Sequence, residues 1–466
     1  MRTRNLLLLL SVIFLAGTVS AQESQFHAEL RREGEKLKES CGKFNLKSLG
    51  GCAQELFTDH PFHIAAGSIA PQNGVGVGMA LVTHWTPNER WRLNINADAV
   101  GSINGSWRAG AYLKAVYIPE RNIVMKSGGA GAPKPKLEVP EYPVLNLFAQ
   151  SISLNKVAYF GLGPSTTVAD RSYFGMRETI VGTNALWPIV GRRLNMSLYG
   201  EANGRFVELR SSNGQPSPSI EQVYTEATAP GLTNQPSFAQ FGEGIRLRPT
   251  LSDYLRLNYM LKFQQFVAPG DSRFSFRRFT VDLNHQIPLY KKTRTLWPRD
   301  HNGPDDCSAS ASDSKHECPQ VTRDLEGSIN VRLLISQSIT SSGHVTPFYF
   351  QPTLGGGDID GRQSLRSYQD YRFRAPNVLL LQGNFEHSIY GPLGFSFMAE
   401  VGKAAFKRDD LDFSHLAHSY SAGLTLRAGG FPMVSLLFAW GSHEGNRTIA
   451  QMNSSLLGGS SRPSLY

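Results

Sequence analysis

Hydrophobic and polar residues alternate along much of this chain. Between residues 91 and 99 every odd position is apolar and every even position is polar. The same alternation recurs over residues 194–203, 255–264, 279–287 and 329–336. Because successive side chains of a β-strand point to opposite faces, each of these segments is predicted to be a strand with one apolar face and one wet face.

The length of these segments favours a membrane barrel over a soluble sandwich or propeller. They run to about ten residues, the length that a tilted strand needs to cross a bilayer, whereas strands of globular sheets average about five or six. Backbone groups in hydrocarbon must be paired within the protein, so such a sheet has to close on itself. Aromatic residues also occur toward the ends of the apolar faces, as at an interfacial girdle, namely Trp91, Trp107, Tyr117 and Trp440.

We therefore predict an all-β fold, in which a single transmembrane antiparallel β-barrel of about 16 strands follows a short N-terminal helical segment. The barrel is expected over residues 63–457, and a short tail over residues 458–466. Stretches rich in turn-forming residues at 118–143, 211–240 and 289–326 are predicted to be connections outside the membrane.

Composition agrees with a β protein and excludes a bundle of spanning helices. The 466 residues include 45 glycines, and only 18% of them are charged. The mean hydropathy is −0.26, and beyond the first 21 residues no run approaches the roughly 20 apolar residues that a spanning helix needs. Any membrane span in the rest of the chain is therefore predicted to be a strand.

The first 21 residues have the pattern of a secretory signal peptide. Arg2 and Arg4 form a basic start, residues 6–16 are apolar, and Val19-Ser20-Ala21 resembles a cleavage site. A membrane-anchoring helix is the alternative, and the short apolar stretch disfavours it. We expect a bacterial protein exported to the outer membrane as a multi-pass β-barrel.

Residues 22–62 are too few for a separate domain of ordinary size and are predicted to form a periplasmic helical and disulfide segment. The charged residues 23–40 carry a thin apolar stripe of Phe26, Leu30 and Leu37. Two placements stay open for this helix, inside the lumen as a plug or along the periplasmic rim.

Two pairs of cysteines have equal spacing. Cys41 and Cys52 are eleven residues apart, and so are Cys307 and Cys318. In a secreted chain the simplest of the three possible pairings is two local disulfides, Cys41–Cys52 and Cys307–Cys318. A metal site is the rival interpretation, but the sequence has no Cys-x-x-Cys.

One motif goes beyond periodicity. Leu354-Gly355-Gly356-Gly357 is followed by Leu365-Arg366-Ser367-Tyr368 and by Tyr371-Arg372-Phe373-Arg374, ahead of a strand at residues 378–386. Together with Tyr159-Phe160-Gly161-Leu162-Gly163-Pro164 and Arg177-Glu178-Thr179, this resembles the bacterial surface antigen superfamily, which includes BamA-type assembly proteins and two-partner-secretion translocators. The resemblance covers roughly residues 63–457, and the chain looks like a compact member without polypeptide-transport-associated domains.

The resemblance implies that Leu365, Arg366, Ser367 and Tyr368 form the tip of a long loop folded back into the barrel. The family's glycine after the motif arginine is Ser367 here. Acidic residues of the next two strands would receive the arginine, and the matching positions are Glu386 and Glu400. Alternation places both carboxylates on the wet face, where an arginine in a narrow lumen needs anions; the alternative is that both only line a solvated pore.

The sequence offers little that indicates an active site. Gly355, Gly356 and Gly357 precede Asp358 without the Gly-Lys-Ser/Thr of a phosphate loop, so flexibility of the long loop is the expected reason for them. No metalloprotease His-Glu-x-x-His and no Gly-x-Ser-x-Gly elbow occurs. We expect no enzyme activity, no cofactor and no metal.

The net charge of +9 does not indicate nucleic-acid binding, because no aromatic and basic binding module accompanies it. Anionic outer-membrane lipid, including lipopolysaccharide, is the expected partner of a basic cluster in the longest connection, which consists of Lys291, Lys292, Arg294 and Arg299.

Two functions stay open at this point. The family resemblance implies a polypeptide translocator or insertase, with an unfolded polypeptide substrate or a periplasmic subunit as partner. The missing recognition domains favour a passive pore or a structural surface protein that has lost translocation.

The disulfide pairing is directly testable. Peptide mapping of the unreduced protein should find Cys41 linked to Cys52 and Cys307 linked to Cys318. Neither link should be needed for the barrel to form, since each ties only a local loop. A peptide joining Cys41 to Cys307 or Cys318 would contradict this pairing.

Overall fold

The computed structural model describes residues 62–119, 141–190, 194–212, 214–252, 255–296, 321–390, 393–428, 431–452 and 463–465. The chain divides into two compact units, residues 1–63 and residues 64–466. The expected signal peptide, the helical segment and all four cysteines lie outside the described residues. Of the expected tail, only residues 463–465 are described.

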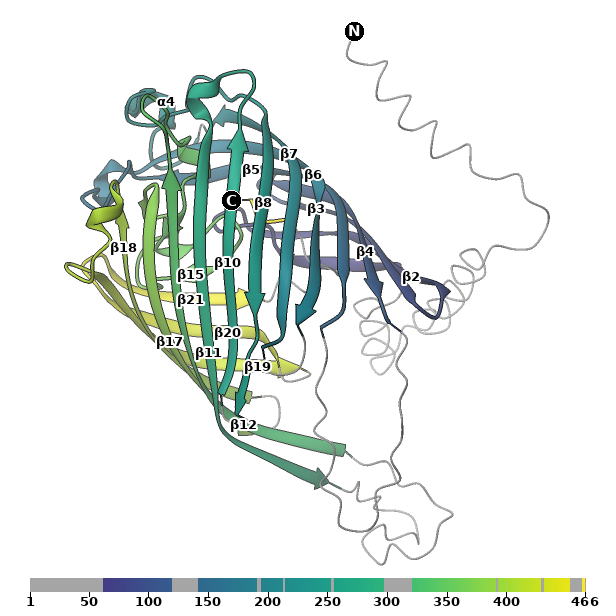
Figure 1. The fold of residues 1–466 in the computed structure, drawn as a ribbon. Coiled ribbons are helices and arrows are strands. Elements are labelled where there is room, and N and C mark those ends of the chain that lie inside the picture. The colour runs from purple at the N-terminus through teal and green to yellow at the C-terminus, as the bar shows by residue number, and fades with distance from the viewer. Residues whose placement is uncertain are drawn as a thin grey trace, which may run out of the picture. The chain divides into compact units, whose positions relative to one another are not determined.

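The described part of the chain is almost entirely β-structure (Figure 1). Its short helical elements are η1 (Val168–Asp170), α4 (Ile220–Val223), η2 (Ser272–Phe274), η3 (Phe348–Phe350) and η4 (Arg408–Asp410). The strands are β1 (Phe62–Ser68), β2 (Val75–Asn88), β3 (Trp91–Ser102), β4 (Trp107–Tyr117), β5 (Val144–Tyr159), β6 (Ser172–Val190), β7 (Met196–Ser211), β8 (Phe238–Leu247), β9 (Thr250–Ser252), β10 (Leu255–Val267), β11 (Phe276–Leu296), β12 (Val321–Ile339), β13 (Thr353–Leu354), β14 (Gly356–Gly357), β15 (Gln363–Ser364), β16 (Phe373–Arg374), β17 (Asn377–Tyr390), β18 (Leu393–Ala405), β19 (Ala417–Ala428), β20 (Phe431–Ser442) and β21 (Gly445–Met452).

One sheet of 17 strands contains all the long strands, and each pairs with the next along the chain. Strands β8 and β9 both pair with β10, so they act as one interrupted strand and the effective number is sixteen. The all-β fold and the number of strands are therefore as predicted. No pairing between β1 and β21 is found among the described residues, so closure at this seam stays a prediction.

The sheet curls around a central segment, and we call this curled sheet the barrel (Figure 1). The segment is residues 353–374, between β12 and β17, which we call the lumenal loop. It bonds to Pro71 beside β2, to Thr166 between β5 and β6, to Glu400 on β18 and to Arg447 on β21. A flat sheet could not bring strands so far apart in its order to one segment.

One predicted connection is partly wrong. Residues 289–326 were expected to lie outside the sheet, but Tyr290–Leu296 of β11 pairs with Val321–Gly327 of β12. The apolar alternation stops at this point, and the prediction depended on it. A backbone ladder needs no apolar side chains, so the two strands continue as a paired ribbon.

Polar and apolar residues are distributed inside-out. Along β8, Gln240 is fully buried, whereas Phe241 is 55% exposed. Buried charged residues of the strands include Asp98, Arg108 and Glu178. A soluble protein buries its large apolar side chains and exposes its charges, so the outer face of these strands is suited to an apolar surrounding. No helix in the described ranges is long and apolar enough to cross a membrane.

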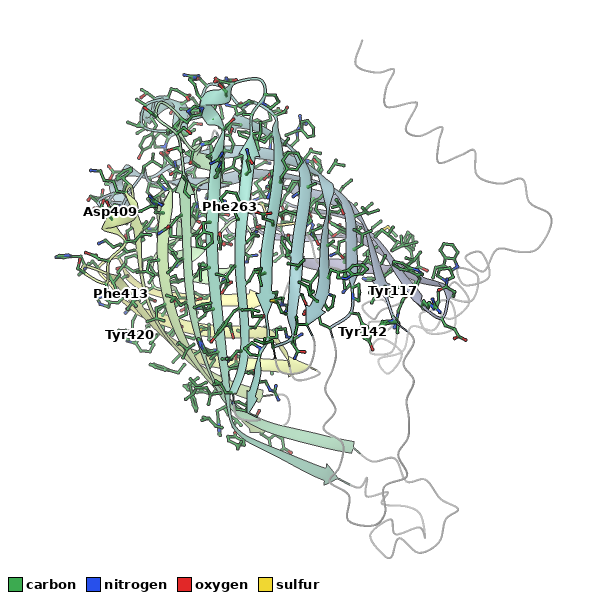
Figure 2. All side chains as sticks on the ribbon, in the orientation of Figure 1. Tyr117, Tyr142, Phe263, Asp409, Phe413 and Tyr420 are labelled. Carbon is green, nitrogen blue, oxygen red and sulfur yellow. The ribbon has the colours of Figure 1, made fainter. Side chains whose placement is uncertain are left out.

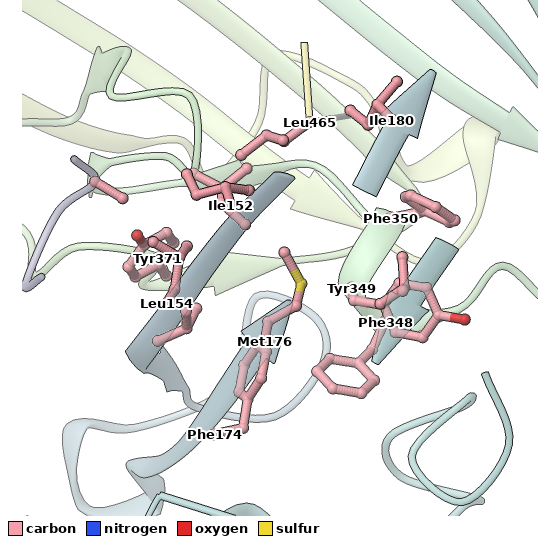
Figure 3. Packing of buried hydrophobic residues seen from close by; sticks show 14 of the residues in the cluster. Ile152, Leu154, Phe174, Met176, Ile180, Phe348, Tyr349, Phe350, Tyr371 and Leu465 are labelled. Atoms are coloured by element: carbon pink, nitrogen blue, oxygen red, sulfur yellow. The ribbon is translucent and has the colours of Figure 1, made fainter. Parts of the chain in front are cut away.

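Buried apolar residues of the strands β5 and β6, of η3, of the segment between β12 and β17 and of residues 463–465 pack together into one cluster (Figure 3). Phe348 of η3 belongs to this cluster, with its ring centroid 5.0 Å from that of Tyr159 and 5.1 Å from that of Phe174, both edge-on. Its backbone N–H donates to Pro230 in the β7–β8 connection (2.8 Å). This cluster positions the start of the lumenal loop.

Whether the outer face of the strands contacts lipid can be tested by placing one charged residue on it. Phe241→Arg should lower the free energy of unfolding in lipid vesicles by up to about 2–4 kcal/mol, the cost of arginine on a lipid-facing strand at the bilayer midplane. The matched control is Phe413→Arg, because Phe413 lies in the β18–β19 connection, outside the strands (Figure 2). Denaturant unfolding followed by tryptophan fluorescence measures both variants, and equal losses would argue against a lipid-facing surface.

Candidate functional site

The lumenal loop folds as a nested β-ribbon. Strand β13 pairs with β16, and inside this pair β14 pairs with β15. A tight turn at residues 358–362 closes the inner pair, where Asp358 N–H donates to the Arg362 carbonyl (2.9 Å). The remaining residues, 365–372, bulge out between β15 and β16, and this bulge carries the motif arginine.

The three loop glycines are required for close packing rather than for flexibility. Gly355 and Gly356 have φ angles of +97° and +57°, a region that other residues rarely adopt. A Cβ at Gly355 would lie 2.5 Å from Cβ of Arg372, and one at Gly357 would lie 2.5 Å from Cγ of Pro71. The expected explanation, a flexible loop, is therefore replaced by one in which glycine lets two backbone segments touch.

Arg366 is held by Glu400 on the barrel wall. Its backbone N–H donates to Glu400 Oε2 (2.9 Å), and its Nη1 forms an ion pair with Glu400 Oε1. The side chain of Glu400 is 1% exposed and that of Arg366 is 9% exposed. Gln382 Nε2 also donates to Glu400 Oε1 (2.6 Å) and to the Gln363 carbonyl (3.0 Å). The carboxylate thus binds the loop and the neighbouring strand together.

The register of strands β17, β18 and β19 explains why the loop binds at Glu400. Gln382 of β17, Glu400 of β18 and Ser419 of β19 stand directly opposite one another on adjacent strands. Side chains in such a row point to the same face of the sheet. Ser419 Oγ accepts a hydrogen bond from the Ser367 N–H (2.8 Å), so two successive loop residues bind this row.

Of the two expected carboxylates, the structure brings Glu400 to Arg366 and leaves Glu386 elsewhere. Glu386 lies four residues beyond Gln382 on β17, about 13 Å further along the strand, and it faces Ser396. Its Oε1 accepts a hydrogen bond from Asn384 Nδ2 (2.8 Å). Alternation identified the correct face for both acids, but only the register distinguishes their heights in the barrel.

Serine in place of the family's glycine creates no strained backbone at Ser367, which is absent from the residues with positive φ. The left-handed residues are instead Leu365 and Tyr371, with φ of +44° and +62°. Both are buried. Such conformations cost about 1–3 kcal/mol each for ordinary residues. The hydrogen bonds of Arg366 and Ser367 to the barrel wall therefore stabilise a backbone conformation that the bulge would not adopt by itself.

A second arginine of the motif ties the loop to two other places. Arg372 Nε pairs with Glu444 in the β20–β21 turn, and its Nη1 donates to Thr166 Oγ1 (2.8 Å). Its guanidinium also stacks over Phe160, 5.1 Å from the ring centroid. Because Phe160 belongs to residues 159–164, two of the three stretches that carry the family resemblance meet at this arginine.

The other residues of the motif also make specific contacts. Gly163 N–H donates to the Arg374 carbonyl (2.7 Å). Tyr368 packs against Phe373, with the ring centroids 5.0 Å apart, and its carbonyl accepts a hydrogen bond from Arg447 Nη1. The loop is therefore fastened to walls on several sides of the barrel.

Several of these partners were not predicted from the sequence. Gln382 could have been found, since it shares the wet face of its strand with Glu386. Ser419, Glu444 and Arg447 carry no local signal, because each is an ordinary polar residue on or near a late strand. In the described residues, no group of three His, Cys, Asp or Glu side chains could hold a metal ion.

Comparison with known proteins gives only distant likenesses. No protein family model matches the sequence, and no curated protein matches it. CdiB from Acinetobacter baumannii is 10% identical with a TM-score of 0.44, over 84% of this chain and 57% of that chain. BamA from Haemophilus ducreyi lacking POTRA domains 1–3 is 11% identical with a TM-score of 0.45, over 84% and 68%. CdiB from Escherichia coli is 11% identical with a TM-score of 0.45, over 82% and 59%.

The chain thus spans 57% to 68% of the lengths of these three structures. With TM-scores below 0.5, these likenesses do not assign the chain to a family. The relation to the surface antigen superfamily stays a resemblance carried by the loop motif.

Arg366 and Glu400 can be tested as a coupled pair. Arg366→Ala should lower the free energy of unfolding by about 3–5 kcal/mol, because it leaves a buried carboxylate without its cation. Adding Glu400→Gln should recover part of this loss, and Arg366→Lys should lose less than Arg366→Ala, because lysine keeps the charge without the planar fork. Denaturant unfolding in vesicles measures all three variants.

The matched control is Arg177→Ala, since Arg177 pairs with Glu208 at a half-exposed position. Exposed pairs contribute about 0–1 kcal/mol. A loss for Arg366→Ala no larger than that for Arg177→Ala would show that the buried pair does not hold the loop.

Proposed function

We propose that this protein is an outer-membrane β-barrel that conducts polypeptides and whose lumen is gated by the lumenal loop. The inside-out distribution of side chains carries the membrane part of this proposal. Large apolar residues such as Val77, Phe206 and Phe241 are more than half exposed on the outer face, while charged residues are buried on the inner face. Hydrocarbon is the surrounding in which that arrangement is stable.

The lumenal loop and its polar contacts support a gated conduit rather than a permanently open pore. The lumenal loop bonds to the barrel wall through Arg366, Arg372 and Arg447, all of which make polar contacts. Polar contacts can be exchanged for contacts with water or with a passing chain at a moderate net cost. A loop fastened in this way blocks the lumen at rest and can be released.

The motif supports a polypeptide as the cargo. The stretch from Leu365 to Tyr368 resembles the loop tip of the surface antigen superfamily, whose members assemble or translocate polypeptides. We therefore propose a translocator or insertase, with an unfolded polypeptide as substrate or a separate periplasmic subunit as partner. A passive pore is the alternative, and the experiment below distinguishes the two.

Single-channel recording in planar bilayers tests the gate. Wild-type protein should show a low conductance, and Arg366→Ala should show a higher and noisier one, because the loop loses its bond to Glu400. Arg177→Ala serves as the matched control and should behave like the wild type. Equal traces for Arg366→Ala and the wild type would contradict gating by the loop.

The same recordings test the cargo. A reduced, unfolded polypeptide added to one side should produce transient blocks in the Arg366→Ala channel. A folded protein of the same sequence should produce none. A channel that conducts ions without polypeptide-dependent blocks would be a passive pore.

A further inference from the structure

Residues 463–465 lie inside the barrel, although they follow the last strand. Leu465 is 4% exposed and belongs to the same buried cluster as Ile152 of β5 and Ile180 of β6, beside which it appears in Figure 3. We call residues 463–465 the tail segment. It adds no strand to the sheet, so specific side-chain contacts must hold it there.

Two charged side chains bind the tail segment. Asp360, in the turn of the lumenal loop, accepts hydrogen bonds from the Leu465 N–H (2.8 Å) and from Ser464 Oγ (2.6 Å). Arg205 of β7 donates from Nη2 to the Ser464 carbonyl (2.7 Å). The side chains of Asp360 and Arg205 are 11% and 2% exposed.

Most of these hydrogen bonds are made to backbone groups, which every extended peptide has. Two of the three are to backbone groups, so they select an extended chain without selecting its sequence. The third recognises a hydroxyl, and the buried surface around Leu465 recognises an aliphatic side chain. The set resembles the way that proteins bind short peptides, with backbone bonds for affinity and pockets for specificity.

Arg205 is held in place by groups outside the tail segment, and a cavity lies beside Ser464. Arg205 is fixed by an ion pair with Glu178 (2.7 Å) and by a bond to Gln240. Ser464 borders a cavity of about 100 Å³ that also touches Asp358 and Arg362. An arginine that is held independently of the tail segment, with a cavity beside Ser464, suits an occupant that exchanges.

We propose that Asp360, Arg205 and the surface around Leu465 form a lumenal binding site for extended peptides in which a hydroxyl residue precedes an aliphatic one, and that the tail segment is its displaceable occupant. The segment links the loop turn to β7 of the barrel wall. Its departure removes one of the fastenings of the loop. This second role, as a latch on the gate, rests on the proposed conduit function; the peptide site itself does not.

The test uses the full chain in detergent micelles. Ser464→Ala combined with Leu465→Ala removes the hydroxyl and the aliphatic anchor while leaving the site intact. A fluorescent peptide of residues 461–466, Ser-Arg-Pro-Ser-Leu-Tyr, should bind this double variant at least about tenfold more tightly than the wild type, whose attached segment competes at high effective concentration. Fluorescence anisotropy measures the binding, and heat-modifiability on gels verifies that the variants fold.

Two controls make the result specific. The isomer Ser-Arg-Pro-Leu-Ser-Tyr has the same composition and should bind much more weakly. Asp360→Ala, added to the double variant, should abolish binding of the first peptide. Equal binding of the two peptides, equal binding by the double variant and the wild type, or no binding at about 1 mM peptide would overturn the proposal.

Conductance measurements distinguish the peptide-binding site from the proposed role of the tail segment as a latch on the conduit. If the conduit function holds, the double variant should conduct more than the wild type, and the peptide should reverse the increase. If the peptide binds with the expected specificity while conductance never changes, the peptide site stands and the latch is refuted.

Discussion

The charges inside the barrel determine how its interior is organised, because an unpaired charge away from water costs several kcal/mol. Each arginine that enters the lumen must therefore find an anion or a carbonyl there. Arginines on the strands form ion pairs with acidic residues of the adjacent strand. Arginines of the loop form ion pairs with acidic residues of the barrel wall and its turns. Among the described residues, the most buried ion pairs of the interior include Arg108 with Asp98, Arg205 with Glu178, Arg366 with Glu400 and Arg372 with Glu444.

This requirement makes the lumenal loop a connector between distant parts of the sheet. Its contacts reach β18 through Arg366, the β20–β21 turn and the β5–β6 connection through Arg372, and residues 463–465 through Asp360. The loop retains left-handed backbone at Leu365 and Tyr371, and the surrounding bonds offset that strain. The loop is therefore ordered by its surroundings more than by its own sequence, and the same polar contacts make its release possible.

Much of the fold could be predicted because strand alternation is a local property. The alternation at residues 91–99 and 255–264 appears as β3 and β10. The prediction failed where alternation stopped, since β11 continues to Leu296 through backbone pairing alone. At the site, alternation placed Glu386 and Glu400 on the inner face, but their different heights depend on the register between strands.

By itself the sequence determined the period of two, the inward and outward faces, and the presence of a loop motif around Arg366. Each of these depends on residues that are neighbours in the chain. Only the tertiary structure decided which acid meets Arg366, why Gly355 is a glycine, and that Leu465 lies in the lumen. These depend on contacts between residues far apart in sequence, where curvature and register set the distances and no local pattern records them.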